Sequence, residues 1–348
     1  MAGVTIKGRR SERHLQAALL ALLTLGGACE KGGDGHPDSG PPSVHPVCEK
    51  DPHARQDAHT PRSLVTDWGL PHRLPSPINT LCPEDAVEIS RDGDALHFLF
   101  TTGLLSDLTP EEVISRPNGT YRARRSEDGG AFAEPVYYDL DAGTDAALDG
   151  APSFAWDGSF VVFHSLRAGN TGYQRHPPTD DILDVYWAPL AGGVPGAASN
   201  LGPAVNSEWP DGEPAIAPGD SILYFTSERP GGAGGDDIWM SVRRDGVWAQ
   251  ATVLPPPVNS IADDTQPAFS ASGDTLYFVS NRDGATGTGI YRCARAGDAW
   301  GEPELVIAGI VGEPSLTADG RVLYFVHVLT DAVGLFDADI WSSERVRP

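Results

Sequence analysis

The sequence predicts an all-β protein, a β-propeller built from four-stranded antiparallel blades, and three observations support this prediction. The 348 residues include 40 glycines and 30 prolines, a composition rich in turns and unfavourable to helices. One sequence unit recurs five times along the chain. The apolar strand at the centre of each unit lacks polar alternation, which is typical of a sheet covered on both faces. Thin sheets that cover one another in this way are the blades of a propeller.

The repeat is clearest when two segments, Trp248–Ser280 and Trp68–Phe100, are aligned without a gap. They share the tryptophan, an asparagine (Asn79 and Asn259) and a Ser-x-x-Gly-Asp turn. Three further copies begin at Asp149, Val205 and Gly312. Five copies predict five blades.

Each unit contains the strands of one blade in the same order. In the fourth copy, a short strand at 267–270 meets a Gly-Asp turn, and an apolar strand follows at 275–280. A third strand then begins with Asp or Gly, as in Asp237-Ile238-Trp239. A fourth strand carrying a tryptophan completes the unit.

The last copy ends after three strands, before the chain stops at Pro348. Residues 63–74 carry a fourth-strand tryptophan, Trp68, yet precede every blade. We therefore predict that 63–74 pairs antiparallel with 338–345 and completes the last blade. This pairing closes the ring and removes an open sheet edge.

The N-terminal residues have the pattern of an export signal. Basic residues from Lys7 to Arg13 precede the apolar run Leu15–Leu25, which is too short to span a bilayer as a mature helix. The sequence Gly-Gly-Ala before Cys29 resembles a lipobox. We therefore predict a lipoprotein signal peptide at 1–29 with lipidation of Cys29, a simple cleaved secretory signal being the alternative. Lipidation places the protein in the cell envelope, periplasmic or at the outer membrane, with the lipid as its only membrane contact.

Residues 30–62 are rich in Gly, Pro, Asp and His and predict a disordered linker before the propeller domain at 63–348. In an oxidising compartment Cys48 and Cys82 are candidates for a disulfide, with Cys293 as a buried thiol. Sequence parity suggests this pairing without fixing it.

The net charge of −23 excludes nucleic acid as a partner, because phosphate binding requires Lys and Arg. An acidic surface favours cationic partners without selecting among them. We expect a monomer whose partner is an envelope protein or a glycan.

Three segments carry a family resemblance. GDTLYFVSNR, DSILYFTSERPGGAGGDDIWM and GRVLYF resemble the WD-like repeats of the TolB-type propeller family. The resemblance covers roughly residues 64–348. It implies an envelope location and binding to other envelope proteins, and it implies no catalytic activity. Better-known members of that family have six blades, whereas five copies are found here.

Acidic and amide residues recur just before each first strand, where they should ring the mouth of the central channel. These candidate binding residues are Glu84, Asp149, Asp211, Glu213, Asp264, Gln266 and Glu313. The alternative role for them is to satisfy backbone donors of the loops. Two long loops, 101–119 and 166–183, open on the same face, and the second adds Tyr173, Arg175 and His176 as candidates.

Binding without catalysis is the function that the sequence favours. A glycoside hydrolase or carbohydrate-binding propeller that uses channel carboxylates is the first alternative, and a structural envelope scaffold is the second. No nucleophile, zinc or phosphate-loop motif is found, and no catalytic residue or cofactor is predicted. Clustered oxygen ligands leave calcium as an alternative. His97 and His164 are interpreted as core histidines, and Arg167, Arg229 and Arg282 as partners of the Asp that begins each third strand.

Overall fold

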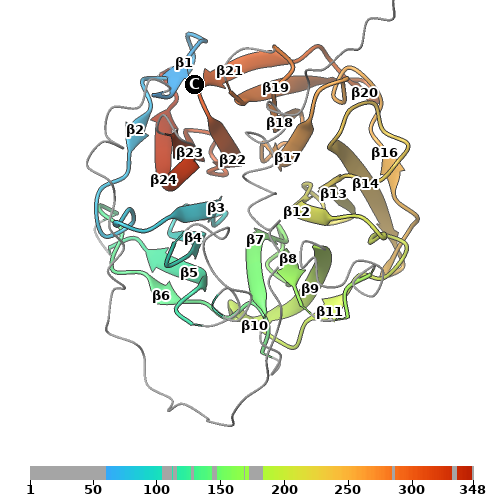
Figure 1. Ribbon diagram of the computed structural model, residues 1–348, viewed down its shortest axis with the longest axis horizontal. Helices are drawn as coiled ribbons and strands as arrows, with labels where there is room; N and C mark the ends of the chain where they lie inside the picture. Colours follow the sequence, from blue (N-terminus) through green and yellow to red (C-terminus); the bar gives the residue numbers. More distant parts are fainter. Residues whose placement is uncertain are drawn as a thin grey trace, which may run out of the picture.

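The structure is a computed structural model that describes residues 60–103, 112, 116–126, 129–142, 147–167, 169–171, 183–283, 287–330 and 335–346. Within these ranges the regular elements are strands, and they form five antiparallel sheets around one axis (Figure 1). The fold is a five-bladed β-propeller, which confirms the prediction from the repeat.

Each blade runs from an inner strand beside the axis to an outer strand at the rim. Blade one consists of β3 (Glu84–Ile89), β4 (Ala95–Phe100), β5 (Gly119–Arg124) and β6 (Val136–Tyr137). Blade two consists of β7 (Leu148–Phe154), β8 (Phe160–Leu166), β9 (Asp184–Ala191) and β11 (Ser199–Asn200). Blade three consists of β12 (Asp211–Ile216), β13 (Ile222–Ser227), β14 (Asp237–Arg244) and β16 (Thr252–Val253).

The last two blades repeat this order. Blade four consists of β17 (Asp264–Phe269), β18 (Thr275–Ser280), β19 (Gly289–Ala296) and β21 (Glu304–Ala308). Blade five consists of β22 (Val311–Leu316), β23 (Val322–Thr330), β24 (Leu335–Glu344) and β2 (His72–Arg73). Short strands pair with the ends of the third strands of blades two, three and four: β10 (Val194–Pro195), β15 (Val247–Trp248) and β20 (Ala299–Trp300).

The N-terminal segment closes the ring as the sequence predicts. In Figure 1, β2 lies beside β24, where His72 pairs with Ser342 in antiparallel register. Trp68 forms an antiparallel bridge with Arg345 and is only 3% exposed. The closure includes an ion pair, since Arg73 Nε donates to Asp339 Oδ2 at 2.7 Å.

One part of the closure differs from the prediction. Ser63 pairs with Ile307 of β21, so β1 (Arg62–Ser63) belongs to blade four. Only the later part of the segment, with β2, pairs with blade five. The chain can reach both sheets because adjacent blades present their outer strands side by side at the rim. The N-terminal segment therefore fastens two blades at once.

The core lies between the blades. Each of the five interfaces is filled by apolar side chains from the second strands of the two blades that meet there. Between blades two and three, for example, Val162 packs with Leu223 and Phe225, all fully buried. Full burial of one such side chain stabilises a fold by about 1.5–3 kcal/mol. No blade has a second sheet of its own, so the stability of each depends on its neighbours.

Asparagines in three of the connections between blades link one blade to the next. Asn259 Oδ1 accepts from Ile238 N at 2.9 Å, and Asn259 Nδ2 donates to the Ile238 carbonyl at 2.9 Å. The following residue, Ser260, donates its backbone N–H to Asp264 at 2.6 Å. The third strand of one blade is thus fixed to the first strand of the next. Asn79 and Asn206 occupy the equivalent positions and make the same paired bonds.

The cysteines agree with the sequence interpretation where they are described. Cys82 is disulfide-bonded, and its partner lies outside the described residues, as do Cys48 and Cys29. Cys293 is a buried free thiol, as predicted. Among the described residues, no helix has the length and hydropathy needed to cross a membrane.

Candidate functional site

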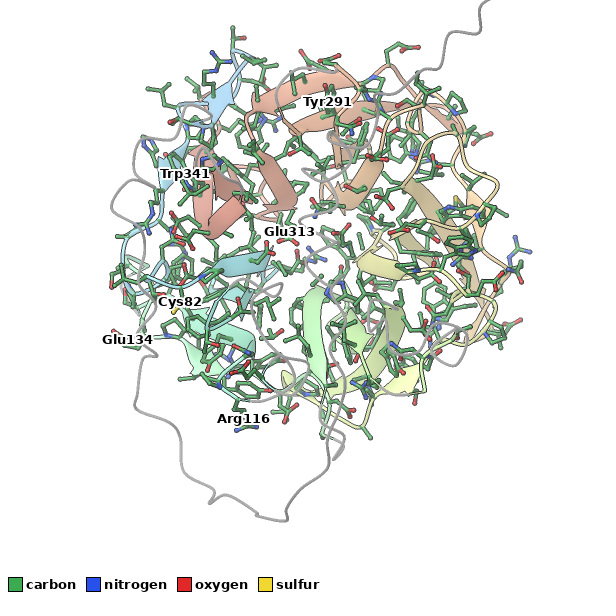
Figure 2. All side chains as sticks on the ribbon, viewed as in Figure 1. Cys82, Arg116, Glu134, Tyr291, Glu313 and Trp341 are labelled. Carbon is green, nitrogen blue, oxygen red and sulfur yellow. The ribbon has the colours of Figure 1, made fainter. Side chains whose placement is uncertain are left out.

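The two faces of the ring differ in what they present to the axis. We call the face on which the first strands begin the loop face, because it also holds the loops between second and third strands. The opposite face, where first and second strands are joined by tight turns, is the hairpin face. Glu313 lies beside the axis in Figure 2, on the innermost strand of blade five.

Every inner strand contains a β-bulge at the same position. The third or fourth residue of each strand adopts a left-handed conformation with φ between 47° and 55°, although none of the five is glycine. These residues are Ala86, Ala151, Glu213, Gln266 and Glu313. A non-glycine residue in this region of φ is strained. Because the strain recurs at the same position in all five blades, we infer that the fold requires these side chains at the axis.

Three of these bulge residues form a continuous hydrogen-bonded chain across blades three, four and five. Gln266 Nε2 donates to Glu213 Oε1 at 2.8 Å, and Glu313 N donates to Gln266 Oε1 at 2.9 Å. The second oxygen of Glu213 accepts from the Thr226 hydroxyl at 2.8 Å. Glu213 and Gln266 are 6% and 5% exposed. With Asp85, these three residues form what we call the channel cluster.

Asp85 joins the cluster from blade one through the carboxyl of Glu313. Burial raises the pKa of both groups, and their mutual contact requires a proton between them. Asp85 Oδ1 and Glu313 Oε2 are fully enclosed, and among the described residues no group outside this pair donates a hydrogen bond to them. The two acids therefore share a proton in place of a counter-charge.

Two further carboxyl groups, those of Glu213 and Asp236, also have raised pKa values. Burial raises the pKa of Glu213 to about 7, although hydrogen bonds from Gln266 and Thr226 oppose the shift. Nearer the loop face, burial raises the pKa of Asp236 to about 8, and repulsion from Glu228 and other carboxylates adds to the shift. Within the described ranges no arginine acts on either acid, in contrast to the acids described next.

Four of the predicted site residues serve the blades instead of the channel. Asp149 binds Arg167 at 2.7 Å, and Asp264 binds Arg282 at 2.5 Å, within their own blades. Asp211 binds Arg229 in the same way. Glu84 accepts from the backbone N–H of Thr80 at 3.0 Å. These carboxylates are neutralised or hydrogen-bonded inside the fold, the structural role weighed for them in the sequence.

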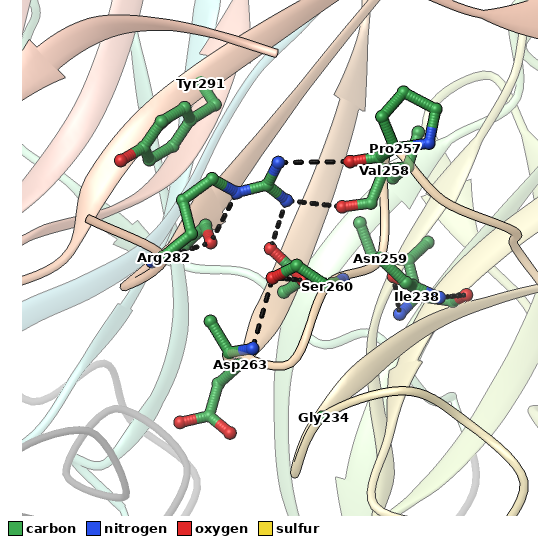
Figure 3. A network of polar contacts seen from close by, with 12 residues as sticks. Gly234, Ile238, Pro257, Val258, Asn259, Ser260, Asp263, Arg282 and Tyr291 are labelled. Atoms are coloured by element: carbon green, nitrogen blue, oxygen red, sulfur yellow. Dashed lines mark hydrogen bonds and ion pairs between the residues drawn. The ribbon is translucent and has the colours of Figure 1, made fainter. Parts of the chain in front are cut away.

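Figure 3 shows how one of these arginines is held. Arg282 donates to the Pro257 carbonyl at 3.0 Å, to the Val258 carbonyl and to Asp264. The predicted in-blade Arg–Asp pair is confirmed, but the Asp is not the residue beside the start of the third strand, as the sequence interpretation had it. The partner is the first-strand Asp, because β18 lies between β17 and β19 and its end meets the start of β17.

The channel cluster borders a cavity of about 50 Å³ on the axis, with room for a few water molecules. Its polar wall comes from blades three to five, through Glu213, Gln266 and Glu313. Blades one and two contribute the apolar residues Ala86, Val87, Ala151 and Pro152, and blade one also contributes Glu88.

The hairpin end of the channel carries a compensated acid. Glu88 forms an ion pair with Arg91 at 3.2 Å, and the Arg91 guanidinium stands 4.2 Å from the centre of the Trp156 ring. Glu88 therefore differs from Asp85, Glu213 and Glu313, which have no such ion pair among the described residues.

The two predicted core histidines have different surroundings. His97 is 4% exposed and packs against Tyr138 and Phe154, which agrees with the prediction. His164 lies beside the channel, where its Nδ1 accepts from Glu213 N at 3.3 Å. Burial lowers the pKa of His97 to about 3 and that of His164 to about 4, so both rings are neutral near pH 7.

Other predicted site residues lie outside the described ranges: Cys29, Tyr173, Arg175 and His176. Within the described ranges, no group of three or more His, Cys, Asp or Glu side chains is arranged to hold a metal ion. Sequence reasoning missed Asp85 and Asp236. Asp236 could have been noticed, because it adjoins the Asp that begins the third strand.

The raised pKa of Glu213 predicts that the domain loses stability as the pH rises. A carboxyl group that binds its proton more tightly when folded contributes stability below its ordinary pKa, and that contribution is lost as pH rises through the folded value near 7. Between pH 5 and pH 8 the free energy of unfolding should fall by about 2 kcal/mol from this group. Urea unfolding at both pH values measures it.

Glu213→Gln is the control for this prediction, because the amide cannot ionise and Gln already occupies the equivalent position in blade four. The variant should lose most of this decrease. An unchanged slope in the variant would assign the pH dependence to other groups.

No protein-family model matches the chain, and no curated protein matches its sequence. Solved structures match through the fold. A glycoside hydrolase is 12% identical with a TM-score of 0.50 and covers 82% of this chain and 92% of its own. A putative TolB from Agrobacterium tumefaciens is 16% identical with a TM-score of 0.43, covering 76% and 84%.

A thermostable family-43 glycoside hydrolase is 13% identical with a TM-score of 0.49, covering 79% and 93%. At such low identity these similarities establish the fold alone. Fold and site together define the class of protein: a five-bladed β-propeller whose axial channel is lined by carboxyl groups.

Proposed function

We propose that this protein is an exported, non-enzymatic binding propeller of the cell envelope, whose partner docks on the loop face over the channel mouth. The observation that carries the proposal is a cluster of buried acids that have no basic partner among the described residues: Asp85, Glu213, Asp236 and Glu313. Burying carboxylates without compensation costs free energy, and a cationic partner would recover it.

The charge of the chain supports a basic partner. The net charge of −23 favours encounter with a positively charged surface. The neighbouring arginines are unavailable to the acids of the channel, because Arg229 and Arg282 are already bound within their blades. The proposal includes export and lipidation at Cys29 and a resemblance to TolB-type propellers. The protein would then be a membrane-tethered domain that recruits a basic envelope protein.

Glycoside hydrolysis is the competing function, since one similar structure is described as a glycoside hydrolase. The channel geometry favours binding over it. Paired catalytic carboxyls are about 5–9.5 Å apart, with the sugar between them. Here Asp85 and Glu313 contact each other, and both oxygens of Glu213 accept hydrogen bonds. Hydrolysis of aryl glycosides by the wild type, lost in Glu213→Gln, would establish the enzyme instead.

The binding proposal is tested by pull-down from an envelope extract with two variants of equal charge change. The loop-face variant combines Glu213→Gln, Asp236→Asn and Glu313→Gln. The control combines Asp245→Asn, Asp298→Asn and Asp319→Asn, three exposed turn residues of the hairpin face. A partner should be retained by the wild type and the control and lost by the loop-face variant. Equal capture by all three proteins would refute docking at this site.

A further inference from the structure

One apolar side chain on the loop face is exposed almost completely. Ile261 lies in the connection from blade three to blade four and is 94% exposed. In the equivalent connection from blade two to blade three, Trp209 is 38% exposed. Single exposed apolar side chains are common on protein surfaces, but two on neighbouring loops of one face can serve together as anchors for a partner.

The connection that carries Ile261 is fixed by hydrogen bonds that begin directly after this residue. Ala262 N donates to Ser260 Oγ at 3.1 Å. Asp263 N donates to Asn281 Oδ1 at 3.0 Å, and Asn281 Nδ2 donates to Asp263 Oδ2 at 3.0 Å. Because the loop is already ordered, a partner that buries the isoleucine pays little conformational entropy for it.

The loop between the second and third strands of blade three, residues 228–236, joins the two connections into one surface. At its start, Glu228 N donates to the Pro210 carbonyl at 3.4 Å, next to the exposed tryptophan. At its end, Asp236 N donates to Asp263 Oδ1 at 3.2 Å, two residues from the exposed isoleucine. The segments 207–210, 228–236 and 260–263 form what we call the anchor surface.

Glycines bring the middle loop directly against the connection that carries Ile261. The loop has the sequence Pro-Gly-Gly-Ala-Gly-Gly at 230–235, and all six residues are exposed except Pro230, which follows a buried arginine. A β-carbon at Gly234 would overlap the Ala262 carbonyl oxygen. Since four residues of this exposed loop have no side chain, the backbone of a partner can approach it closely.

Carboxyl groups of the anchor surface repel one another. Burial raises the pKa of Glu228, and repulsion from Asp263 and Asp211 adds to the shift. Burial likewise raises the pKa of Asp236, and Glu228 and Asp263 are among the acids that repel it. A positively charged side chain placed among these carboxyl groups would relieve the repulsion.

We propose that the anchor surface binds a protein segment in which a basic residue is flanked by apolar residues. The basic side chain lies among Glu228, Asp236 and Asp263, and the apolar side chains pack on Ile261 and Trp209. This inference rests on the proposed function and specifies which part of a basic partner is recognised. The apolar contacts supply most of the binding free energy, whereas the carboxyl groups select the sign of the partner's charge.

Photo-crosslinking from the full chain tests the proposal. The probe p-benzoylphenylalanine replaces Ile261 in one protein and Val247 in the control, since Val247 is 70% exposed and lies on the hairpin face. After irradiation in an envelope extract, mass spectrometry identifies the crosslinked peptide. We expect the probe at 261, and not the probe at 247, to label a peptide that combines Lys or Arg with aliphatic or aromatic residues.

Four other outcomes of the crosslinking would overturn the inference. They are the absence of an adduct at 261, an adduct with lipid, an adduct with a second copy of this chain, and an adduct with a peptide that lacks Lys and Arg. Labelling of the same peptide with equal yield from 247 would overturn it as well.

The labelled peptide is then synthesised, and its affinity is measured by fluorescence anisotropy. Ile261→Ser should weaken binding by about tenfold or more, the effect of losing one buried aliphatic side chain. Glu228→Gln should weaken binding more at low salt than at high salt, because the lost attraction is screened by ions. The control Val247→Ser should bind as the wild type does. Equal affinity of Ile261→Ser and the wild type would contradict the proposal.

The envelope pull-down described above separates a failure of this inference from a failure of the proposed function. If the loop-face variant loses its partner while Ile261→Ser captures it as the wild type does, the proposed function stands and this inference fails. If both variants capture the partner as the wild type does, both proposals fail.

Discussion

Replacement of Arg229 by methionine is expected to destabilise the domain by about 3–5 kcal/mol, because it leaves a buried carboxylate without its partner. Arg229 is 9% exposed and binds Asp211, which is fully buried. The same guanidinium donates to Ser227 Oγ at 2.8 Å and stands 5.0 Å from the centre of the Trp239 ring. One side chain therefore connects the first, second and third strands of blade three.

The matched control is Arg321→Met, whose ion pair with Asp319 is exposed, with side-chain exposures of 79% and 57%. An exposed pair contributes at most about 1 kcal/mol. Chemical denaturation of both variants and the wild type at pH 7 gives the comparison. Similar small losses in both variants would show that the buried arginine is not needed to compensate Asp211.

Deletion of residues 60–74 is expected to abolish cooperative folding. The deletion removes β2, which is the outer strand of blade five, and β1, which extends blade four. It also removes Trp68, which is 3% exposed. Loss of one buried aromatic side chain costs about 3–5 kcal/mol, comparable to the whole stability of many domains. The exposed edge of β24 would also be free to pair with other chains.

The control for the deletion is a chain that begins at Thr60, with both proteins kept reduced because Cys82 then lacks its disulfide partner. The control should unfold in a single thermal transition seen by circular dichroism, whereas the deleted chain should show none and should aggregate. A cooperative transition in the deleted chain near the temperature of the control would mean that the ring does not need its N-terminal closure.

The fold could be predicted from the sequence because all five blades have the same strand order and the same packing, and the sequence repeats accordingly. The apolar strands at 96–100 and 276–280 are alike because each is covered by neighbouring blades in the same way. The missing fourth strand of the last copy predicted the closure. The division of the N-terminal segment between two blades could not be predicted, because nothing in the sequence around Ser63 and Trp68 distinguishes an outer strand of blade four from one of blade five.

The site was predicted only in part, and the inner-strand bulge is the reason. Asp211 and Glu213 are two residues apart, so a regular strand would direct both side chains to the same side. The register shift between Gly212 and Ala215 separates them. Asp211 binds Arg229 within the blade, while Glu213 turns to Gln266 and the channel. The sequence Glu213-Pro214 does not reveal that Glu213 adopts a left-handed conformation, so it could not be predicted that Asp211 and Glu213 point in different directions.

Asp85 was missed for a related reason. It precedes the bulge residue of blade one, at a position held by glycine in blades two, three and five: Gly150, Gly212 and Gly312. The repeat therefore offered no acidic precedent for it. Its contact with Glu313 arises only because closure of the ring brings blade five against blade one, as the shared core of β3 and β23 shows.

The carbon-13 NMR titration of the glutamate carboxyl groups tests most directly whether the channel holds acids without counter-charge. The account predicts one resonance that titrates near pH 7 in the wild type and is missing in Glu213→Gln. Glutamate resonances that all titrate below about pH 5 in the free protein, as ordinary exposed carboxyls do, would contradict it.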